Sequence, residues 1–510
     1  MDDLDTLAMH ARDQPQKVAL IAGERKLEFA AYDQQANRAA GVLKRLGVEP
    51  GDRVATMSYN SIEGAIASQG GQRLGSIGVP ISYRLGAAEV AYIVNDSGAR
   101  VVLAGEEFVP IVEEARALVE GERQYVALAG DPADGWRAFS ELMAEADPSP
   151  FQSRRPPGLP PSMIYTSGTT GNPKGAYRKN GVDLLAVMRI LAAFEITGSD
   201  VYLLAGPGYH SAPLLFGALT GAVGGTTVIE RKFDAEEALA LIDRHHCTLT
   251  AMAPTLLQRI MDLPDQVRRG YDVGSMRALI MAAAPCPFSL KERAIAYFGE
   301  SLWEFYGATE TGVNLVLRPE DQLRKPGSCG TPLDGVEVLL TDDGGREVAV
   351  GEPGELWVRT GSLAEYYNRP AATAGSMRDG FFSVGDIAYR DQDGYYFICD
   401  RRVDMIISGG VNIYPAEVEA VLFAHPAVAD VAVIGVPDAH WGESVKAVVQ
   451  LHSGTTPTEA ELVEWCSARL AGYKRPRSVD FVPELPRDLA GKLQKRKVRE
   501  PYWAGTGRRL

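Results

Sequence analysis

Two hydrophobic periods alternate along the first part of the chain. Apolar and small residues recur with helical spacing between residues 29 and 48, where one face carries Tyr32, Ala36, Ala39, Ala40 and Leu43. Short apolar runs that predict buried strands follow at residues 52–59 (DRVATMSY), 162–167 (SMIYTS), 277–285 (RALIMAAAP) and 301–307 (SLWEFYG). Alternating helices and strands of this kind predict an α/β fold whose loops meet at the carboxyl ends of the strands.

The pattern changes after Asp400 to that of a small, separate unit. Pro415 suits the first turn of a helix that buries Val418, Val421 and Leu422, and strands are expected at 428–436 and 443–451. Thr458 and Glu461 form a capping-box pattern before a helix with one apolar face, Leu462, Trp465, Cys466 and Leu470. We therefore predict a large domain of α/β-layered subdomains at 1–400, a hinge at 401–404 and a small mobile α+β domain at 405–510.

Charge and composition exclude several classes of protein. With 510 residues and 45% apolar side chains, the chain can bury substantial cores. A net charge of −14 argues against a general nucleic-acid binder, which needs a basic surface. Residues 471–510 are the exception, with eleven Lys or Arg and four Asp or Glu. These cations are either solvated surface charges or, in part, face a polyanionic small molecule.

Signals for export, membranes and metal are not found. Residues 1–20 lack the basic start and apolar middle of a secretory signal, so a cytoplasmic protein is expected. The most apolar stretch, 214–229, is interrupted by four glycines and is too short for a membrane span. The five cysteines are scattered without C-x-x-C pairs, which fits a reducing compartment without structural zinc.

Residues 165–175 (YTSGTTGNPKG) form the most informative segment. Backbone amides of a glycine-rich turn can surround phosphate oxygens, and hydroxyl side chains and a lysine add donors and positive charge. The segment is not a Walker A loop, because Gly168 and Gly171 are too close together and Gly175, not Ser or Thr, follows Lys174. A flexible surface loop is the alternative that composition alone leaves open.

This segment resembles the signature loop of the adenylate-forming (ANL) superfamily, which includes acyl-CoA synthetases, fatty-acid–CoA ligases, adenylation domains and luciferases. The resemblance implies that ATP phosphates are bound by Thr166, Ser167, Gly168, Thr169, Thr170, Gly171 and Lys174. The family's later motifs follow in order. In YGATETG (306–312), Tyr306 would stack on adenine, Gly307 would border adenine and the acyl group, Thr309 would contact phosphate and Glu310 would bind Mg²⁺.

Four further motifs complete the resemblance. AAAP (282–285) implies an adenine turn of Ala283, Ala284 and Pro285, with Ala282 beside the acyl group. DGFFSVGD (379–386) implies that Asp386 binds the ribose, with Arg401 beside it. Val384 and the hinge residue Val403 depart from the family's usual Thr and Lys or Asp. DRRVDMIISGGVNIYPAEVE (400–419) implies that Gly409, Gly410 and Asn412 border the path of the thiol. PRDLAGKLQKR (486–496) implies that Lys492 is the lysine essential for adenylation.

The resemblance implies a two-step ligase that uses ATP, Mg²⁺ and, as co-substrate, coenzyme A. His210 is expected at the mouth of an acyl pocket bordered by residues 211–221 (SAPLLFGALTG). That stretch has no acidic residue to pair with an amino group, and the chain ends at Leu510 without a carrier-protein domain, so free CoA and a fatty, aryl or polycyclic acid are expected. The alternatives are an enzyme that loads a separate carrier protein and a non-catalytic nucleotide-binding protein. The residues leave homo-oligomerisation open.

Overall fold

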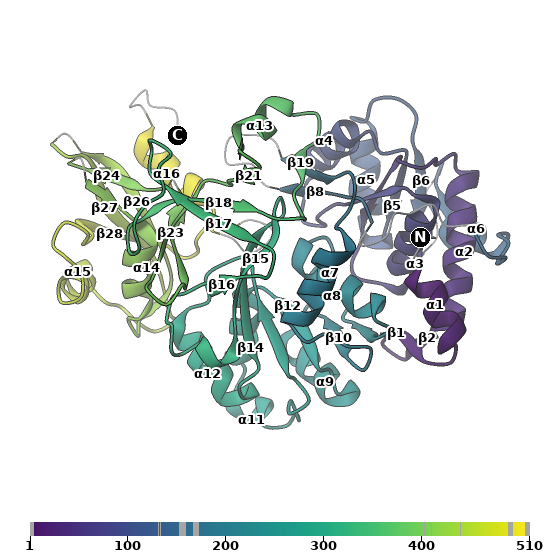
Figure 1. Cartoon of the computed structure of the whole chain (residues 1–510), viewed down its shortest axis with the longest axis horizontal. Coiled ribbons are helices and arrows are strands. Elements are labelled where there is room, and N and C mark those ends of the chain that lie inside the picture. Colours follow the sequence, from purple (N-terminus) through teal and green to yellow (C-terminus); the bar gives the residue numbers. More distant parts are fainter. Residues whose placement is uncertain are drawn as a thin grey trace.

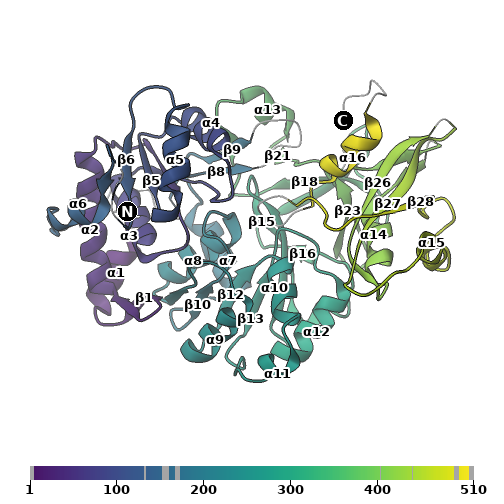
Figure 2. The same ribbon diagram turned by 180° about the vertical axis from the view of Figure 1, so that it is seen from behind.

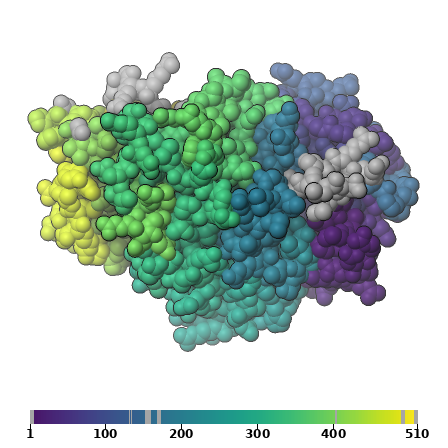
Figure 3. Space-filling view, viewed as in Figure 1, coloured from purple at the N-terminus to yellow at the C-terminus, as the bar shows by residue number. Residues whose placement is uncertain are grey.

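The computed structural model describes residues 5–130, 132, 134–151, 160–166, 173–401, 404–409, 411–438, 440–487 and 493–504. Two large, mainly parallel sheets lie side by side in the first 370 residues, and a small antiparallel sheet connects them to a lobe at the C-terminal end (Figure 1). The N- and C-terminal parts of the chain occupy opposite ends of the molecule in the space-filling view (Figure 3). The α/β fold class expected from the sequence is confirmed. No helix in the described part of the chain combines the length and apolarity of a membrane span.

The first large sheet has eight strands and is covered on both faces. Its strand order is β19 (Glu365–Tyr366), β9 (Lys174–Arg178), β8 (Ser162–Thr166), β4 (Ile77–Pro80), β3 (Arg53–Met57), β5 (Val101–Ala104), β6 (Gln124–Ala127), β7 (Arg137–Ala138). Side chains alternate along β3. Val54 packs with α2 (Phe29–Arg45), α3 (Ile62–Leu74) and α6 (Phe139–Ala144). Ala55 packs with α4 (Ala87–Ser97) and α5 (Val109–Arg116) on the other face.

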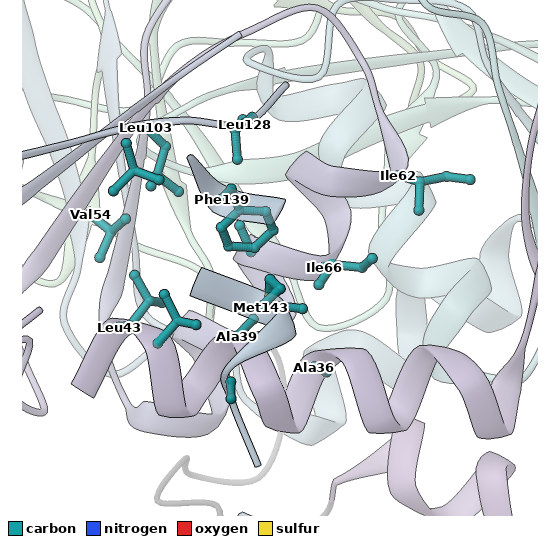
Figure 4. Close-up of a cluster of buried hydrophobic side chains, with 14 of the residues drawn as sticks. Ala36, Ala39, Leu43, Val54, Ile62, Ile66, Leu103, Leu128, Phe139 and Met143 are labelled. Carbon is teal, nitrogen blue, oxygen red and sulfur yellow. The ribbon is translucent and has the colours of Figure 1, made fainter. Parts of the chain in front are cut away.

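The helix predicted at 29–48 is α2, and its apolar face is the one expected. Ala36, Ala39, Ala40 and Leu43 are all buried, while Tyr32 is half-buried. Figure 4 shows Ala36, Ala39 and Leu43 with the side chains of Ile66, Phe139 and Met143 in one buried cluster. This cluster also receives Leu7 of α1 (Thr6–Asp13).

The second large sheet has nine strands. Its order is β16 (Thr331–Pro332), β15 (Gly312–Leu317), β14 (Leu302–Ala308), β13 (Ala278–Met281), β12 (Leu249–Met252), β10 (Val201–Leu204), β11 (Thr226–Ile229), β1 (Val18–Ala22), β2 (Arg25–Glu28). Tyr202 of β10 packs with α7 (Leu184–Ala193) and α8 (Ser211–Ala222). Leu203 packs on the opposite face, which α9 (Ala235–His245), α10 (Pro254–Met261) and α12 (Phe288–Phe298) cover and where α11 (Asp265–Arg268) also lies (Figure 2).

A six-stranded antiparallel sheet links the large sheets to the C-terminal lobe. It contains β17 (Glu337–Thr341), β18 (Gly354–Arg359), β20 (Met377–Arg378), β21 (Phe381–Phe382), β22 (Asp386–Arg390) and β23 (Tyr396–Arg401). The short helix α13 (Pro370–Gly375) lies between β19 and β20 in the chain. Strand β23 ends at Arg401, the first residue of the predicted hinge, whose Val403 lies outside the described residues.

The C-terminal lobe has a five-stranded sheet with helices on both faces. Its strands are β24 (Ile406–Ser408), β25 (Val411–Ile413), β26 (Val428–Asp438), β27 (Gly442–Leu451) and β28 (Ser478–Phe481). One face is covered by α14 (Pro415–Phe423) and α15 (Glu459–Ser467), and the other by α16 (Lys495–Trp503). The Pro415 start and the Thr458–Glu461 capping box are as predicted. Leu470 lies beyond the end of α15, because the helix stops at Ser467.

Candidate active site

A single cleft with a volume of about 2960 Å³ follows the carboxyl ends of strands from both large sheets. Its walls come from the ends of β3, β4, β8, β10, β13 and β14, and they continue into the six-stranded sheet and the C-terminal lobe. The predicted site residues that line it are Thr166, Lys174, His210, Ala282, Ala283, Ala284, Pro285, Tyr306, Gly307, Thr309, Glu310 and Asp386. The convergence of loops that the sequence predicted is therefore observed.

Glu310 is buried at the centre of this set. Its Oε1 accepts hydrogen bonds from Thr166 Oγ1 at 3.4 Å and from Tyr366 Oη at 3.0 Å. Lys174 Nζ lies 5.0 Å from the centroid of the Tyr366 ring, within the range of a cation–π contact. Two residues of the loop at 165–175 and the carboxylate of the YGATETG motif thus meet at one point.

Arg178 lies behind Glu310, at the end of β9. Its side chain is buried and donates to the carbonyl oxygens of Ser362, at 2.8 Å, and Thr309. Burial lowers the pKa of Arg178 to about 10, although Glu310 opposes this shift. The guanidinium group therefore fixes the turn that carries Thr309 and Glu310.

Sequence reasoning missed both Arg178 and Tyr366. Arg178 could have been noticed as a cation four residues after Lys174 in an otherwise apolar strand. No signal points to Tyr366, because β19 reaches β9 only through strand pairing, with Tyr366 opposite Ala176.

Tyr306 and Asp386 form a second contact in the cleft. The Tyr306 hydroxyl donates to Asp386 Oδ2 at 2.6 Å, and Asp386 is opposite Arg401 in the β22–β23 register. A Cβ atom at Gly307 would lie 2.0 Å from the Gly312 carbonyl oxygen, so only glycine fits beside Tyr306. The structure therefore holds together the aromatic ring predicted to stack on adenine and the carboxylate predicted to bind ribose.

The turn at 282–285 has an unusual backbone. Ala283 has φ of +74°, a conformation that costs a non-glycine residue of order 1–3 kcal/mol. The turn follows β13 directly and lines the cleft. Such strain in a loop at the mouth of a cleft is typical of a functional turn.

His210 is the residue before α8, and its loop is held by Asn60. Asn60 Nδ2 donates to the carbonyl oxygens of Gly206 and Glu230 at 3.0 Å, and Asn60 Oδ1 accepts from Gly208 N at 2.8 Å. Beyond His210, α8 presents to the cleft mainly apolar and small residues: Ser211, Ala212, Leu214, Leu215, Gly217, Ala218, Gly221 and Ala222. None of these α8 residues has an acidic side chain.

Some predicted residues are not tested by the geometry. Ser167, Gly168, Thr169, Thr170, Gly171, Val403, Gly410 and Lys492 lie outside the described residues. Only the backbone of Arg401 is described. Gly409 is not among the residues that line the cleft. It lies in the turn between β24 and β25, where its amide donates to the Trp441 carbonyl oxygen at 2.8 Å.

The fold and cleft are those of an adenylate-forming enzyme, and comparison with known proteins identifies the family. The model of the AMP-binding enzyme family matches residues 7–368, and that of the AMP-binding enzyme C-terminal domain matches residues 417–492. The chain therefore belongs to the AMP-binding enzyme family, as an adenylate-forming protein of the acyl-CoA synthetase type.

Relatives match over almost the whole chain. Feruloyl-CoA synthase of an Amycolatopsis species is 37% identical, in an alignment that covers 96% of this chain and 97% of the relative's chain. The fatty acid–[acyl-carrier-protein] ligase ScoC of Streptomyces coeruleorubidus is 33% identical over 99% of this chain and 98% of its own. The crystal structure of ATP-bound MatB from Rhodopseudomonas palustris superposes with a TM-score of 0.87 at 30% identity, covering 98% and 99% of the two chains.

Proposed function

We propose that the protein is an ATP-dependent ligase that joins an apolar carboxylic acid to coenzyme A. The observation that carries this proposal is the cleft in which Thr166 and Glu310 approach each other at one point and Tyr306 and Asp386 at another, with the apolar wall of α8 beside them. Membership of a family of acid–thiol ligases supports the same conclusion.

The proposed first step is the transfer of AMP to the acid. Tyr306 and the turn at 283–285 bind adenine, Asp386 and Arg401 bind ribose, and residues 166–174 bind the phosphates. A carboxylate oxygen of the acid attacks the α-phosphorus, and the bond to pyrophosphate breaks. Lys492 stabilises the negative charge that develops on the oxygens.

The proposed second step uses the thiol of CoA. The sulfur attacks the acyl carbonyl carbon of the acyl-adenylate, AMP leaves with the bonding electrons, and the thiol proton is released. Gly409 and Gly410 would border the thiol path after the C-terminal lobe has rotated about Val403, as the family resemblance implies.

The residues around Glu310 fit a magnesium ion. A carboxylate beside a hydroxyl offers the hard oxygen ligands that Mg²⁺ prefers, and Mg²⁺ in ATP sites is usually held by one or two carboxylates with the phosphates. No cluster of three or more His, Cys, Asp or Glu suited to a metal occurs in the described part of the chain. Glu310 would therefore hold Mg²⁺ together with the nucleotide, where the ion neutralises phosphate charge.

The acid is proposed to be fatty, aryl or polycyclic. The α8 wall lacks a carboxylate that could pair with a substrate ammonium group, and an unpaired buried charge costs several kcal/mol. The relative named feruloyl-CoA synthase supports an aryl acid. The cytoplasm is the proposed location, since all five cysteines are free thiols.

A second candidate is an enzyme that loads a carrier protein. It is favoured by the relative ScoC, which is named as an acyl-carrier-protein ligase. The two candidates differ only in the thiol of the second step.

Pyrophosphate release tests the proposal. Purified protein is incubated with ATP, Mg²⁺ and a panel of fatty, aryl, polycyclic and amino acids, with and without CoA. We expect release that depends on an apolar acid and accelerates with CoA. Acid-dependent release that CoA does not change, but that a phosphopantetheinyl carrier protein accelerates, would favour the second candidate. No release with any acid would contradict both.

A further inference from the structure

Three segments that are distant in sequence meet at the carboxylate of Asp96 on α4. Tyr165 Oη, at the end of β8, donates to Asp96 Oδ2 at 2.7 Å. Arg369 Nη2, just before α13, donates to Asp96 Oδ1 at 3.0 Å. The Asp96 side chain is 11% exposed, and hydrogen bonds in which the donor or the acceptor is ionised are stronger than neutral ones.

Tyr92 lies one turn before Asp96 on the same face of α4. Its hydroxyl donates to the Pro173 carbonyl oxygen at 3.2 Å and accepts from Arg369 Nη2 at 3.2 Å. Tyr165 and Pro173 are the immediate neighbours of Thr166 and Lys174. One helix face therefore holds both flanks of the segment that we propose to bind the ATP phosphates.

Arg369 connects the same helix to Glu310. The amide of Arg369 donates to the Tyr366 carbonyl oxygen at 3.0 Å, and Tyr366 Oη donates to Glu310 at 3.0 Å. Neither Tyr92, Asp96 nor Arg369 is among the residues that line the cleft. Among the described residues, the contacts of these side chains towards the cleft run through Tyr165, Pro173 and Tyr366.

The Tyr165 phenol is suited to a permanent donor role. Burial raises its pKa well above the ordinary value, and the hydrogen bond to Asp96 acts in the same direction. The proton therefore stays on Tyr165, which acts as the donor to Asp96.

We propose that Asp96 is a positioning residue for ATP. With Tyr92 it anchors to α4 the paired strands β8 and β9, in which Thr166 lies opposite Lys174, and through Arg369 it directs Tyr366 towards Glu310. The inference rests on the proposed function only in taking ATP as the ligand. It adds a residue outside the cleft to those on which nucleotide affinity depends.

The chain contains a matched control. Asp321 also accepts hydrogen bonds from a tyrosine and an arginine, Tyr395 Oη at 2.6 Å and Arg324 Nε at 3.0 Å. None of these three residues is among those that line the cleft. Asp321→Asn therefore removes the same kind of buried charge without altering the flanks of the phosphate segment.

The test measures ATP affinity by titration calorimetry in the absence of any acid, using wild type, Asp96→Asn and Asp321→Asn. We expect Asp96→Asn to weaken ATP binding by about tenfold, because Tyr165 and Arg369 both lose their ionised acceptor. Asp321→Asn should lower the melting temperature to a similar extent and leave ATP affinity within about twofold of wild type. Equal loss of affinity in both variants, or none in Asp96→Asn, would overturn the inference.

Two further variants keep the inference testable if Asp96→Asn does not fold. Tyr92→Phe removes the contacts of the Tyr92 hydroxyl with the Pro173 carbonyl oxygen and with Arg369, and should weaken ATP binding by about threefold. Tyr165→Phe should weaken ATP binding as well. In the Asp96→Asn background, Tyr165→Phe should add little further loss, because both substitutions affect the same Tyr165–Asp96 contact. Unchanged affinity in both single variants would overturn the inference.

The steady-state profile separates this inference from the proposed function. With an accepted acid, Asp96→Asn should raise the KM for ATP and leave the KM for the acid unchanged. A wild-type protein that binds ATP but releases no pyrophosphate with any acid would contradict the ligase, while the calorimetric comparison would still decide the role of Asp96. A wild-type protein that does not bind ATP would contradict both.

Discussion

Glu230 carries a buried carboxyl group directly after strand β11. Its side chain is 3% exposed, and Oε1 accepts from the Asp234 amide at 2.5 Å. Oε2 has no hydrogen-bond partner among the described residues. Burial raises the pKa of Glu230 to about 8, so the folded protein keeps this group largely protonated at neutral pH.

The raised pKa predicts a stability that falls with pH. Between pH 4.5, the ordinary pKa of glutamate, and about 8, the unfolded chain loses this proton before the folded one. Protonated Glu230 therefore contributes fully to the free energy of unfolding below this pH window, and its contribution declines as the pH rises to about 8. The side chain of Glu230→Gln cannot ionise, so the melting temperature of this variant relative to wild type should rise between pH 5 and 8. The corresponding gain in unfolding free energy relative to wild type is at most about 1.4 kcal/mol per unit of pKa shift.

Thermal unfolding at several pH values checks this prediction. A Glu230→Gln difference that is constant from pH 5 to 8 would show that the carboxyl group does not titrate in this window.

Lys492 belongs to the residues whose role rests on the sequence motif. Lys492→Ala should lower acid-dependent pyrophosphate release by about 10²-fold or more, because it removes the charge that stabilises the developing oxyanion. Thioester formation from a supplied acyl-adenylate should be nearly unchanged. Arg475→Ala, which removes an exposed cation from the same basic segment, should leave pyrophosphate release unchanged. Equal loss of both half-reactions in Lys492→Ala would refute the assignment.

At the residue scale, the sequence predicted those residues lining the cleft that lie inside contiguous motifs. Thr166, Tyr306, Glu310 and Asp386 were all predicted, because each motif is a short string with a recognisable chemistry. Tyr366 was missed, because its position depends on a strand pairing between distant segments. Such contacts are a property of the folded chain and leave no local pattern.

At the scale of elements, the contact between α2 and α3 shows what a helical period can and cannot predict. The apolar face of α2 was predicted from spacing alone, but its partner helix was not. Gly70 of α3 packs so closely on α2 that an added Cβ atom would lie 2.5 Å from Ala39 Cβ and 2.7 Å from Ala40 N. The close approach requires glycine and is invisible in the sequence of either helix.

This contact predicts opposite effects for two glycine substitutions. Gly70→Ala should destabilise the protein by about 1–3 kcal/mol, because the helices must move apart. Gly41→Ala in α2 has no atom within 4 Å of the new Cβ and should stabilise by about 0.5–1 kcal/mol through helix propensity. Urea denaturation measures both. A stabilising Gly70→Ala would mean that α2 and α3 are not packed as closely as the structure indicates.

At the scale of the whole molecule, one buried ion pair joins the C-terminal lobe to the rest of the chain. Lys495, at the start of α16, contacts Asp400 Oδ2 of β23 at 3.1 Å and Glu419 Oε1 of α14 at 3.0 Å. Burial alone would lower the pKa of Lys495, but the two carboxylates raise it above its usual value. On the predicted domain boundary, Asp400 belongs to the large domain and the other two residues to the small one.

The boundary therefore makes the two contacts of Lys495 unequal. In the proposed rotation about residues 401–404, the Lys495–Glu419 pair would move as one unit with the small domain, whereas the Lys495–Asp400 pair would exist only where α16 lies near the end of β23. Asp400→Asn should lower the population of the observed orientation. The rates of adenylation and thioester formation should then change in opposite directions, each by about threefold, because one half-reaction gains the population that the other loses. Glu419→Gln is the control, and it should lower the melting temperature and keep the ratio of the two rates within about twofold of wild type.

Single-turnover measurements of the two half-reactions distinguish these outcomes. Parallel changes in both rates for Asp400→Asn would place the hinge elsewhere than residues 401–404.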